Sequence, residues 1–121
     1  MRTTEVAARV RKTATQYGLV SYMNDTKWRE VCDGFRQWPR PPRFRVHDLL
    51  AADGYVSEWD SEWYYHPLPY VSIQWLEVEL RGEQVSAALE LCKRAGAAVE
   101  RTPSGLRIWG WVGRADLPQL A

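Results

Sequence analysis

The spacing of apolar residues predicts two amphipathic helices in this chain. The first spans residues 25–37, and prolines at positions 39, 41 and 42 end it because proline cannot continue a helix. Its apolar stripe consists of Trp28, Val31, Cys32, Phe35 and Trp38. The second helix spans residues 82–95, and Gly96 follows it at the position where glycine commonly ends a helix.

Runs of β-prone residues predict strands between and after these helices. Residues 55–58 and 62–66 flank a short polar turn and indicate a hairpin. Residues 71–80 form the longest strand candidate, and residues 97–101 and 106–112 follow the second helix.

Alternation assigns the side chains of these strands to two faces. We expect one face to meet the second helix, and it contains Leu76, Val78, Ile108 and Val112. The opposite face carries Trp75, Glu77 and Glu79 on one strand and Arg107, Trp109 and Trp111 on another. We expect that face either to meet the first helix or to face solvent.

The order of elements predicts an α+β fold with one domain. A mostly antiparallel sheet of four to five strands, packed with two main helices, is the economical arrangement. A chain of 121 residues is too short for two independent cores. We expect residues 23–121 to form the domain and residues 1–22 to be an extension, either a helical arm or the product of an upstream start codon.

Charge is distributed unevenly along the chain, although the net charge is only +1. Residues 51–80 carry six acidic residues and no lysine or arginine, which makes an acidic block. No apolar run is long enough to span a membrane, and the first residues lack the pattern of a secretion signal. We therefore expect a cytoplasmic protein that does not bind membranes, with Cys32 and Cys92 buried as small apolar residues.

Motifs for catalysis or for cofactors are not found in the sequence. It contains no glycine-rich phosphate loop and no metal-binding spacing, so we expect no cofactor, no metal and no enzymatic activity. The nearest approach to a catalytic group is formed by Glu58, Asp60, Glu62 and His66. Solvated carboxylates at a hairpin tip titrate normally and make poor general acids, so an exposed acidic edge is the simpler interpretation.

Aromatic and acidic residues are interleaved between positions 55 and 66. One interpretation is that the rings fill the core, which explains Trp28 and Trp38 well. The other is a protein interface, because tryptophan and tyrosine next to charge are typical of interface hot spots. The candidate partner-binding residues are Glu58, Trp59, Asp60, Glu62, Trp63, Tyr64, His66, Trp75, Glu77 and Glu79.

A basic stretch precedes the acidic block and contains Arg36, Arg40, Arg43 and Arg45. Arginines between aromatic residues can bind single-stranded nucleic acid. We favour a proline-rich connector whose arginines pair with the acidic block, and we expect no nucleic-acid partner because the acidic residues would repel phosphates.

Three segments of the sequence resemble a family of small bacterial proteins known as a domain of unknown function. The segments are NDTKW from Asn24, GYVSEWDSEWYYH from Gly54 and IQWLEV from Ile73. The resemblance covers about residues 23–113 and implies no catalytic residues.

These observations favour a non-catalytic protein-binding domain. We expect an immunity or antitoxin type of protein that neutralises a toxin by covering a basic surface, since an acidic patch selects a basic partner. The alternative is a domain that binds a small molecule or carbohydrate by stacking on Trp59, Trp63, Trp109 and Trp111. An enzyme that uses Glu58, Glu62 and His66 is a more remote third possibility.

Overall fold

The computed structural model describes residues 3–51, 54–63 and 69–113. Its elements, in chain order, are α1 (Thr3–Tyr17), β1 (Leu19–Ser21), α2 (Asp25–Arg36), β2 (Phe44–Asp48), the 3-10 helix η2 (Tyr70–Ser72), β3 (Ile73–Glu79), α3 (Gln84–Ala95), β4 (Val99–Thr102), β5 (Gly105–Trp109) and β6 (Trp111–Gly113). An antiparallel sheet has the strand order β2-β3-β5-β4, and β1 pairs with β6 in a second, small sheet. The expectation of a single α+β domain is confirmed.

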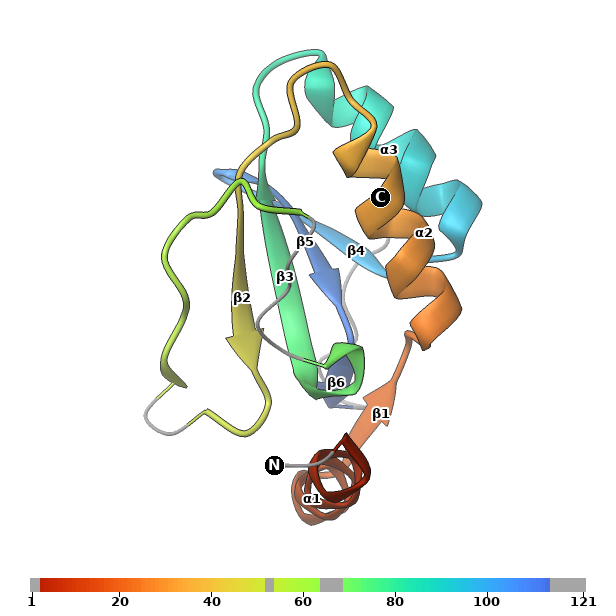
Figure 1. Cartoon of the computed structure of the whole chain (residues 1–121), viewed down its shortest axis with the longest axis vertical. Coiled ribbons are helices and arrows are strands. Elements are labelled where there is room, and N and C mark those ends of the chain that lie inside the picture. Colours follow the sequence, from red (N-terminus) through yellow and green to blue (C-terminus); the bar gives the residue numbers. More distant parts are fainter. Residues whose placement is uncertain (1–2, 52–53, 64–68, 114–121) are drawn as a thin grey trace.

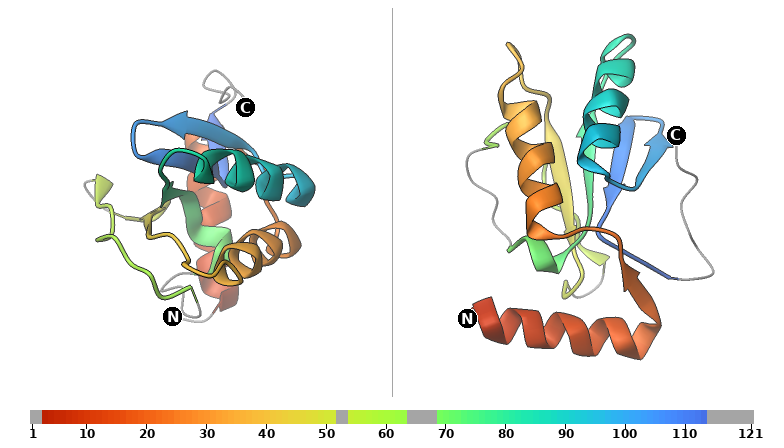
Figure 2. Two further views of the ribbon diagram at one scale, coloured as in Figure 1. Left: turned by 90° about the horizontal axis from the view of Figure 1, so that it is seen from above. Right: turned by 90° about the vertical axis from the view of Figure 1, so that its right-hand side faces the viewer.

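Helices α2 and α3 lie side by side on one face of the four-stranded sheet (Figure 1). The views in Figure 2 show that the opposite face of the sheet carries no helix in the described part of the chain. Both predicted helices are confirmed, with Asn24 capping α2 through a 2.8 Å hydrogen bond from the backbone of Lys27 and with Gly96 in the left-handed conformation after α3. The sheet side of the core is formed by Phe44, Val46, Leu76, Val78, Val99, Leu106 and Ile108.

The predicted strand over residues 106–112 is interrupted at Gly110. Strand β5 ends at Trp109, and β6 then pairs with β1 so that Val112 lies opposite Val20. The expectation that Val112 meets the second helix is therefore wrong. The chain can leave its pairing with β3 and begin to pair with β1 at this point, because Gly110 has no side chain where the backbone of Ile73 approaches it.

The N-terminal segment is joined to the rest of the molecule at two places. Strand β1 pairs with β6, and the backbone N–H of Tyr22 donates to the carbonyl of Gly110 over 2.9 Å. Helix α1 lies across one end of the sheet beside η2 (Figure 2). Its residues Val10 and Ala14 are buried. None of the three α-helices in the described ranges has both the length and the apolar character that a membrane crossing requires.

The predicted hairpin over residues 55–66 is wrong in its described part. Residues 54–60 instead follow the outer edge of β2, with isolated bridges from His47 to Val56 and from Phe44 to Asp60. The backbone N–H of Val46 also donates to the hydroxyl of Ser57 over 2.9 Å. Hydrogen bonding to β2 therefore replaces the hairpin pairing that the sequence pattern indicated. Residues 64–66 of the predicted hairpin lie outside the described ranges.

We predict that Gly110→Ala lowers the free energy of unfolding by about 3 kcal/mol, because the added methyl group overpacks against the carbonyl of Ile73. The matched control is Gly82→Ala, which has open space around it and costs only about 1 kcal/mol for its left-handed backbone. Urea denaturation of both variants measures the difference. Equal losses for the two variants would contradict the close approach at Gly110.

Candidate functional site

Polar and aromatic side chains occupy the face of the sheet that the helices leave uncovered. We call it the open face, and it consists of Arg45, His47, Trp75, Glu77, Glu79, Glu100, Thr102, Arg107 and Trp109. These residues alternate with the core residues because successive side chains of a strand point to opposite faces. Trp75 and Trp109 therefore lie on the side away from α2 and α3, whereas Trp111, expected on the same face, belongs to β6 and lines a cavity with Trp28 of α2.

A row of alternating charges crosses the open face from strand to strand. Glu77 on β3 lies opposite Arg45 on β2 and opposite Arg107 on β5, and Arg107 lies opposite Glu100 on β4. Opposite charges on directly paired residues stabilise a sheet, because such side chains are close enough to interact. The strand register thus sets the order of the charges.

Glu77 is the centre of this row, and its side chain is only 2% exposed. One carboxylate oxygen, Oε1, accepts hydrogen bonds from Arg45 Nη2 at 3.0 Å and Arg107 Nη2 at 3.3 Å. The other oxygen, Oε2, accepts a hydrogen bond from the hydroxyl of Thr102 at 2.9 Å. Both oxygens of this buried carboxylate are therefore satisfied, as a buried charge requires.

The surroundings of Glu77 hold its carboxylate in the charged form. Burial alone would raise its pKa, but the hydrogen bonds from Thr102, Arg45 and Arg107 and the charge of Arg45 outweigh that effect. The pKa of Glu77 is therefore lowered from its ordinary value of 4.5.

Tryptophan rings hold the two guanidinium groups of the row. The guanidinium carbon of Arg107 lies 4.0 Å from the ring centre of Trp75, and that of Arg45 lies 4.5 Å from the ring centre of Trp59. Stacking of this kind is favourable because the face of an aromatic ring attracts a cation. The Nε of Arg107 is buried and has no hydrogen-bond partner in the described part of the chain.

A second ion pair lies beside the central row. Arg43 donates two hydrogen bonds to Glu79, from Nε at 2.9 Å and from Nη2 at 2.7 Å. This pair is much more exposed than Glu77, because the side chain of Arg43 is 53% exposed. The expectation that arginines of the basic stretch pair with the acidic block is confirmed for Arg43 and Arg45.

Exposed acidic residues remain along the loop that borders the open face at β2. We call Glu58, Asp60 and Glu62 the acidic rim, and all three are exposed. Asp60 also orders the loop, because its Oδ1 accepts a 2.9 Å hydrogen bond from the backbone of Glu62. Trp59 is next to Glu58 and Asp60 in the sequence, and the guanidinium groups of Arg43 and Arg45 lie over its ring.

Several sequence-predicted site residues lie where the pattern did not place them. Trp63 is 5% exposed in the core, where it stacks on Phe35 and donates from Nε1 to the carbonyl of Pro42 at 2.7 Å. Trp75 is 8% exposed, so it supports Arg107 and is not a free anchor. The interface interpretation requires these rings and the carboxylate of Glu77 to be exposed to solvent, and in that respect it is wrong.

The remaining site residues divide into two groups. The structure brings Trp59, Trp75, Glu77 and Glu79 together, with the acidic rim beside them. Tyr64 and His66 lie outside the described residues, so their predicted role stays a prediction.

Sequence reasoning did not include Arg107, Thr102 and Glu100 among the site residues. Arg107 and Thr102 both bond Glu77, and Glu100 accepts a 3.4 Å hydrogen bond from Trp109 Nε1. A signal was present, because alternation places Arg107 and Glu77 on the same face of two predicted strands. The pairing of those strands was needed to bring the charges together.

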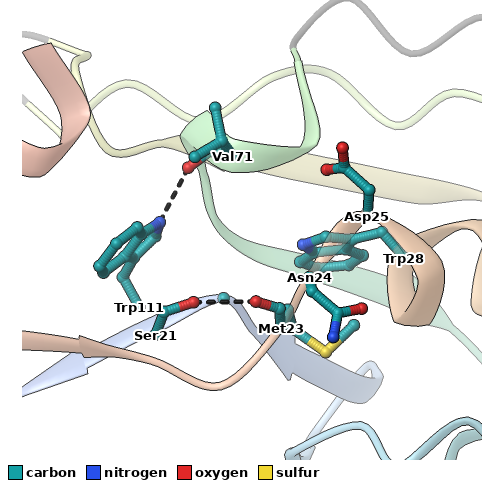
Figure 3. Close-up of a pocket in the computed structure, with 8 residues that line it drawn as sticks. Ser21, Met23, Asn24, Asp25, Trp28, Val71 and Trp111 are labelled. Carbon is teal, nitrogen blue, oxygen red and sulfur yellow. Dashed lines mark hydrogen bonds between the residues drawn. The ribbon is translucent and has the colours of Figure 1, made fainter. Parts of the chain in front are cut away.

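The tryptophans proposed as a stacking surface for carbohydrate do not share one place. Trp63 is in the core, whereas Trp111 donates from Nε1 to the carbonyl of Val71 at 2.8 Å. Figure 3 shows Trp111 and Trp28 on opposite sides of a cavity of about 60 Å³, which is far smaller than the roughly 300 Å³ of a typical ligand pocket. Two larger hollows of about 410 and 480 Å³ are lined by none of the tryptophans.

Neither cysteine has the properties of a nucleophile. Both are free and buried, as expected, and burial raises the pKa of the thiol to about 11 for Cys32 and to about 12 for Cys92. In the described ranges, no group of three or more histidine, cysteine, aspartate or glutamate side chains is arranged to hold a metal ion.

The fold and this face define a small α+β protein with helices on one side of its sheet and an ordered array of arginine, glutamate and tryptophan on the other. The chain belongs to the family of unknown function DUF6678, whose model matches residues 10–115. The match begins within α1, so it includes more of the N-terminal segment than the sequence resemblance did. Searches of the curated proteins and of the solved structures found no match.

We predict that Glu77→Gln lowers the free energy of unfolding by about 3 kcal/mol, because it leaves the partly buried charges of Arg45 and Arg107 without a counter-charge. The matched control, Glu79→Gln, breaks the exposed pair with Arg43 and should cost less than about 1 kcal/mol. Denaturant titration at neutral pH compares the two. A smaller loss at Glu77 than at Glu79 would contradict the central role of the buried carboxylate.

The lowered pKa of Glu77 predicts how stability changes in acid. In the unfolded chain this carboxyl group binds its proton near the ordinary pKa of 4.5, whereas in the folded protein it does so at lower pH. Its contribution to stability is therefore complete above the ordinary value and is lost as the pH falls through the folded value. We expect the stability difference between the wild type and Glu77→Gln to shrink between neutral pH and pH values below 4.5, as measured by denaturant titration at each pH. A difference that stays constant across this range would disprove the assignment.

Proposed function

We propose that this chain is a non-catalytic domain that binds a protein partner on the open face and the acidic rim. The observation that supports it most is the charged row Arg45–Glu77–Arg107, which lies on the side of the sheet that no described helix covers. A macromolecule that bound there would contact β2, β3 and β5 together.

The energetic balance of the charged row favours recognition over structural support. Taking a carboxylate and two guanidinium groups partly out of water is costly, and well-packed apolar residues are often as stable or more stable at such a place. A face that served only to complete the fold would therefore gain little net stability from this row beyond the fixing of the strand register. Arginine and tryptophan are also the residue types that contribute most to protein interfaces.

The acidic rim indicates the charge of the partner. The carboxylates of the open face bond to groups of the chain itself, as Glu77 and Glu79 do to arginines, whereas Glu58 and Glu62 have no side-chain partner in the described part of the chain. An exposed row of carboxylates attracts a basic surface and selects against an acidic one. An immunity or antitoxin protein, which covers the basic surface of a toxin, is the form of this function that we favour.

We predict that the double variant Glu58→Lys with Glu62→Lys captures about tenfold less of its main protein partner from a lysate of the source organism, as quantified by mass spectrometry. Both residues are exposed, so the fold is preserved. The matched control is Glu30→Lys with Glu90→Lys, which makes the same change in net charge at exposed positions of α2 and α3.

The control variant should capture the partner as the wild type does. Equal loss in both double variants would mean that net charge alone attracts the partner, and undiminished capture by the rim variant would remove the rim from the interface. Either result contradicts the proposed site.

A further inference from the structure

Two arginines share a single carboxylate on the open face. The Nη2 atoms of Arg45 and Arg107 lie 3.0 and 3.3 Å from the same oxygen, Oε1 of Glu77. The guanidinium groups are therefore close together, and two positive charges face one negative charge. Glu79 is bonded to Arg43. Glu100 lies opposite Arg107 on β4 and accepts a hydrogen bond from the indole N–H of Trp109.

The donor groups of this arginine pair are only partly used. Arg45 bonds Glu77 through Nε and Nη2, and Arg107 bonds it through Nη2. In the described part of the chain, the Nη1 groups of both make no hydrogen bond. The side chains remain 33% and 26% exposed, so a ligand can approach them from solvent.

The arginine pair is also held in place before any ligand arrives. Glu77 anchors one end of each guanidinium, and the rings of Trp59 and Trp75 stack on Arg45 and Arg107. A planar guanidinium fixed in this way loses little freedom on binding, which favours an oxyanion with two acceptor oxygens.

The surrounding carboxylates limit the charge of that oxyanion. Glu79 and Glu100 flank the arginine pair on the open face, and the acidic rim lies beyond Trp59. A ligand with many negative charges, such as nucleic acid, would be repelled by these groups. A single carboxylate carries the smallest negative charge that still offers two acceptor oxygens to the Nη1 groups of the arginine pair.

We propose that Arg45 and Arg107 bind one carboxylate of the protein partner, a glutamate or aspartate set among the basic residues that face the acidic rim. This inference rests on the proposed function and adds the chemical identity of one contact. The partner surface would therefore be basic with an acidic residue at its centre.

The test uses the full chain, labelled with ¹⁵N, and sodium acetate as the carboxylate probe, with ionic strength held constant by sodium chloride. We expect saturable shifts in the Nε–H signals of Arg45 and Arg107 and in the indole N–H signals of Trp59 and Trp75. Arg45→Lys keeps the positive charge beside Glu77 but loses the planar fork, so acetate should bind about tenfold more weakly. Arg94→Lys, at an exposed position in the last turn of α3 on the other side of the sheet, is the matched control and should leave acetate binding unchanged.

Three results would overturn the carboxylate site. They are the absence of a saturable acetate effect, an affinity that Arg45→Lys does not change, and binding of inorganic phosphate or of a short single-stranded oligonucleotide as tight as that of acetate. Partner capture by the rim variants is measured separately. If capture depends on the rim while acetate does not bind, the protein-binding function stands and only the carboxylate contact fails.

Discussion

The carboxylate of Glu77 sets the main constraint on this structure. Because the side chain is only 2% exposed, its negative charge must be compensated by groups of the protein itself. These groups come from three different strands. Arg45 lies on β2, Arg107 on β5 and Thr102 on β4. A shift of any of these strands by one residue would turn its side chains to the other face and leave the charge unpaired. The network thus stabilises one register of the whole sheet.

The two faces of the same strands serve different purposes. The face under α2 and α3 is apolar and contributes most of the stability through burial. The open face contributes less stability but holds charged groups at fixed positions. The acidic block of the sequence is divided by this arrangement: Glu77 and Glu79 are neutralised by arginines, and only the rim keeps its carboxylates free of ionic partners in the described ranges.

Both main helices, the α+β class and the division of the strand residues into two faces followed from local patterns in the sequence, whereas the direction of the tryptophan face was left open between the first helix and solvent. Helical spacing and caps depend on neighbouring residues, so Asn24 and Gly96 could be read directly. The failures have long-range causes. The local pattern indicated an interface role for Trp63. Its actual contacts, with Phe35 and with the carbonyl of Pro42, depend on the path of the loop along β2, which no local pattern shows. Likewise, no local pattern pairs Arg107 with Glu77, which is thirty residues earlier in the chain.

The loop along β2 has a consequence for association between copies of the protein. A sheet with bare edge strands offers unpaired backbone groups to other chains, which promotes aggregation. Residues 54–60 occupy the outer edge of β2 through two isolated bridges and a hydroxyl group of Ser57, and this irregular pairing offers no continuous ladder to extend. At the other edge, β4 has only four residues, among them Glu100 and exposed Arg101. In the described part of the chain, the sheet can therefore carry helices on one face alone (Figure 2) while both of its edge strands resist pairing with further chains.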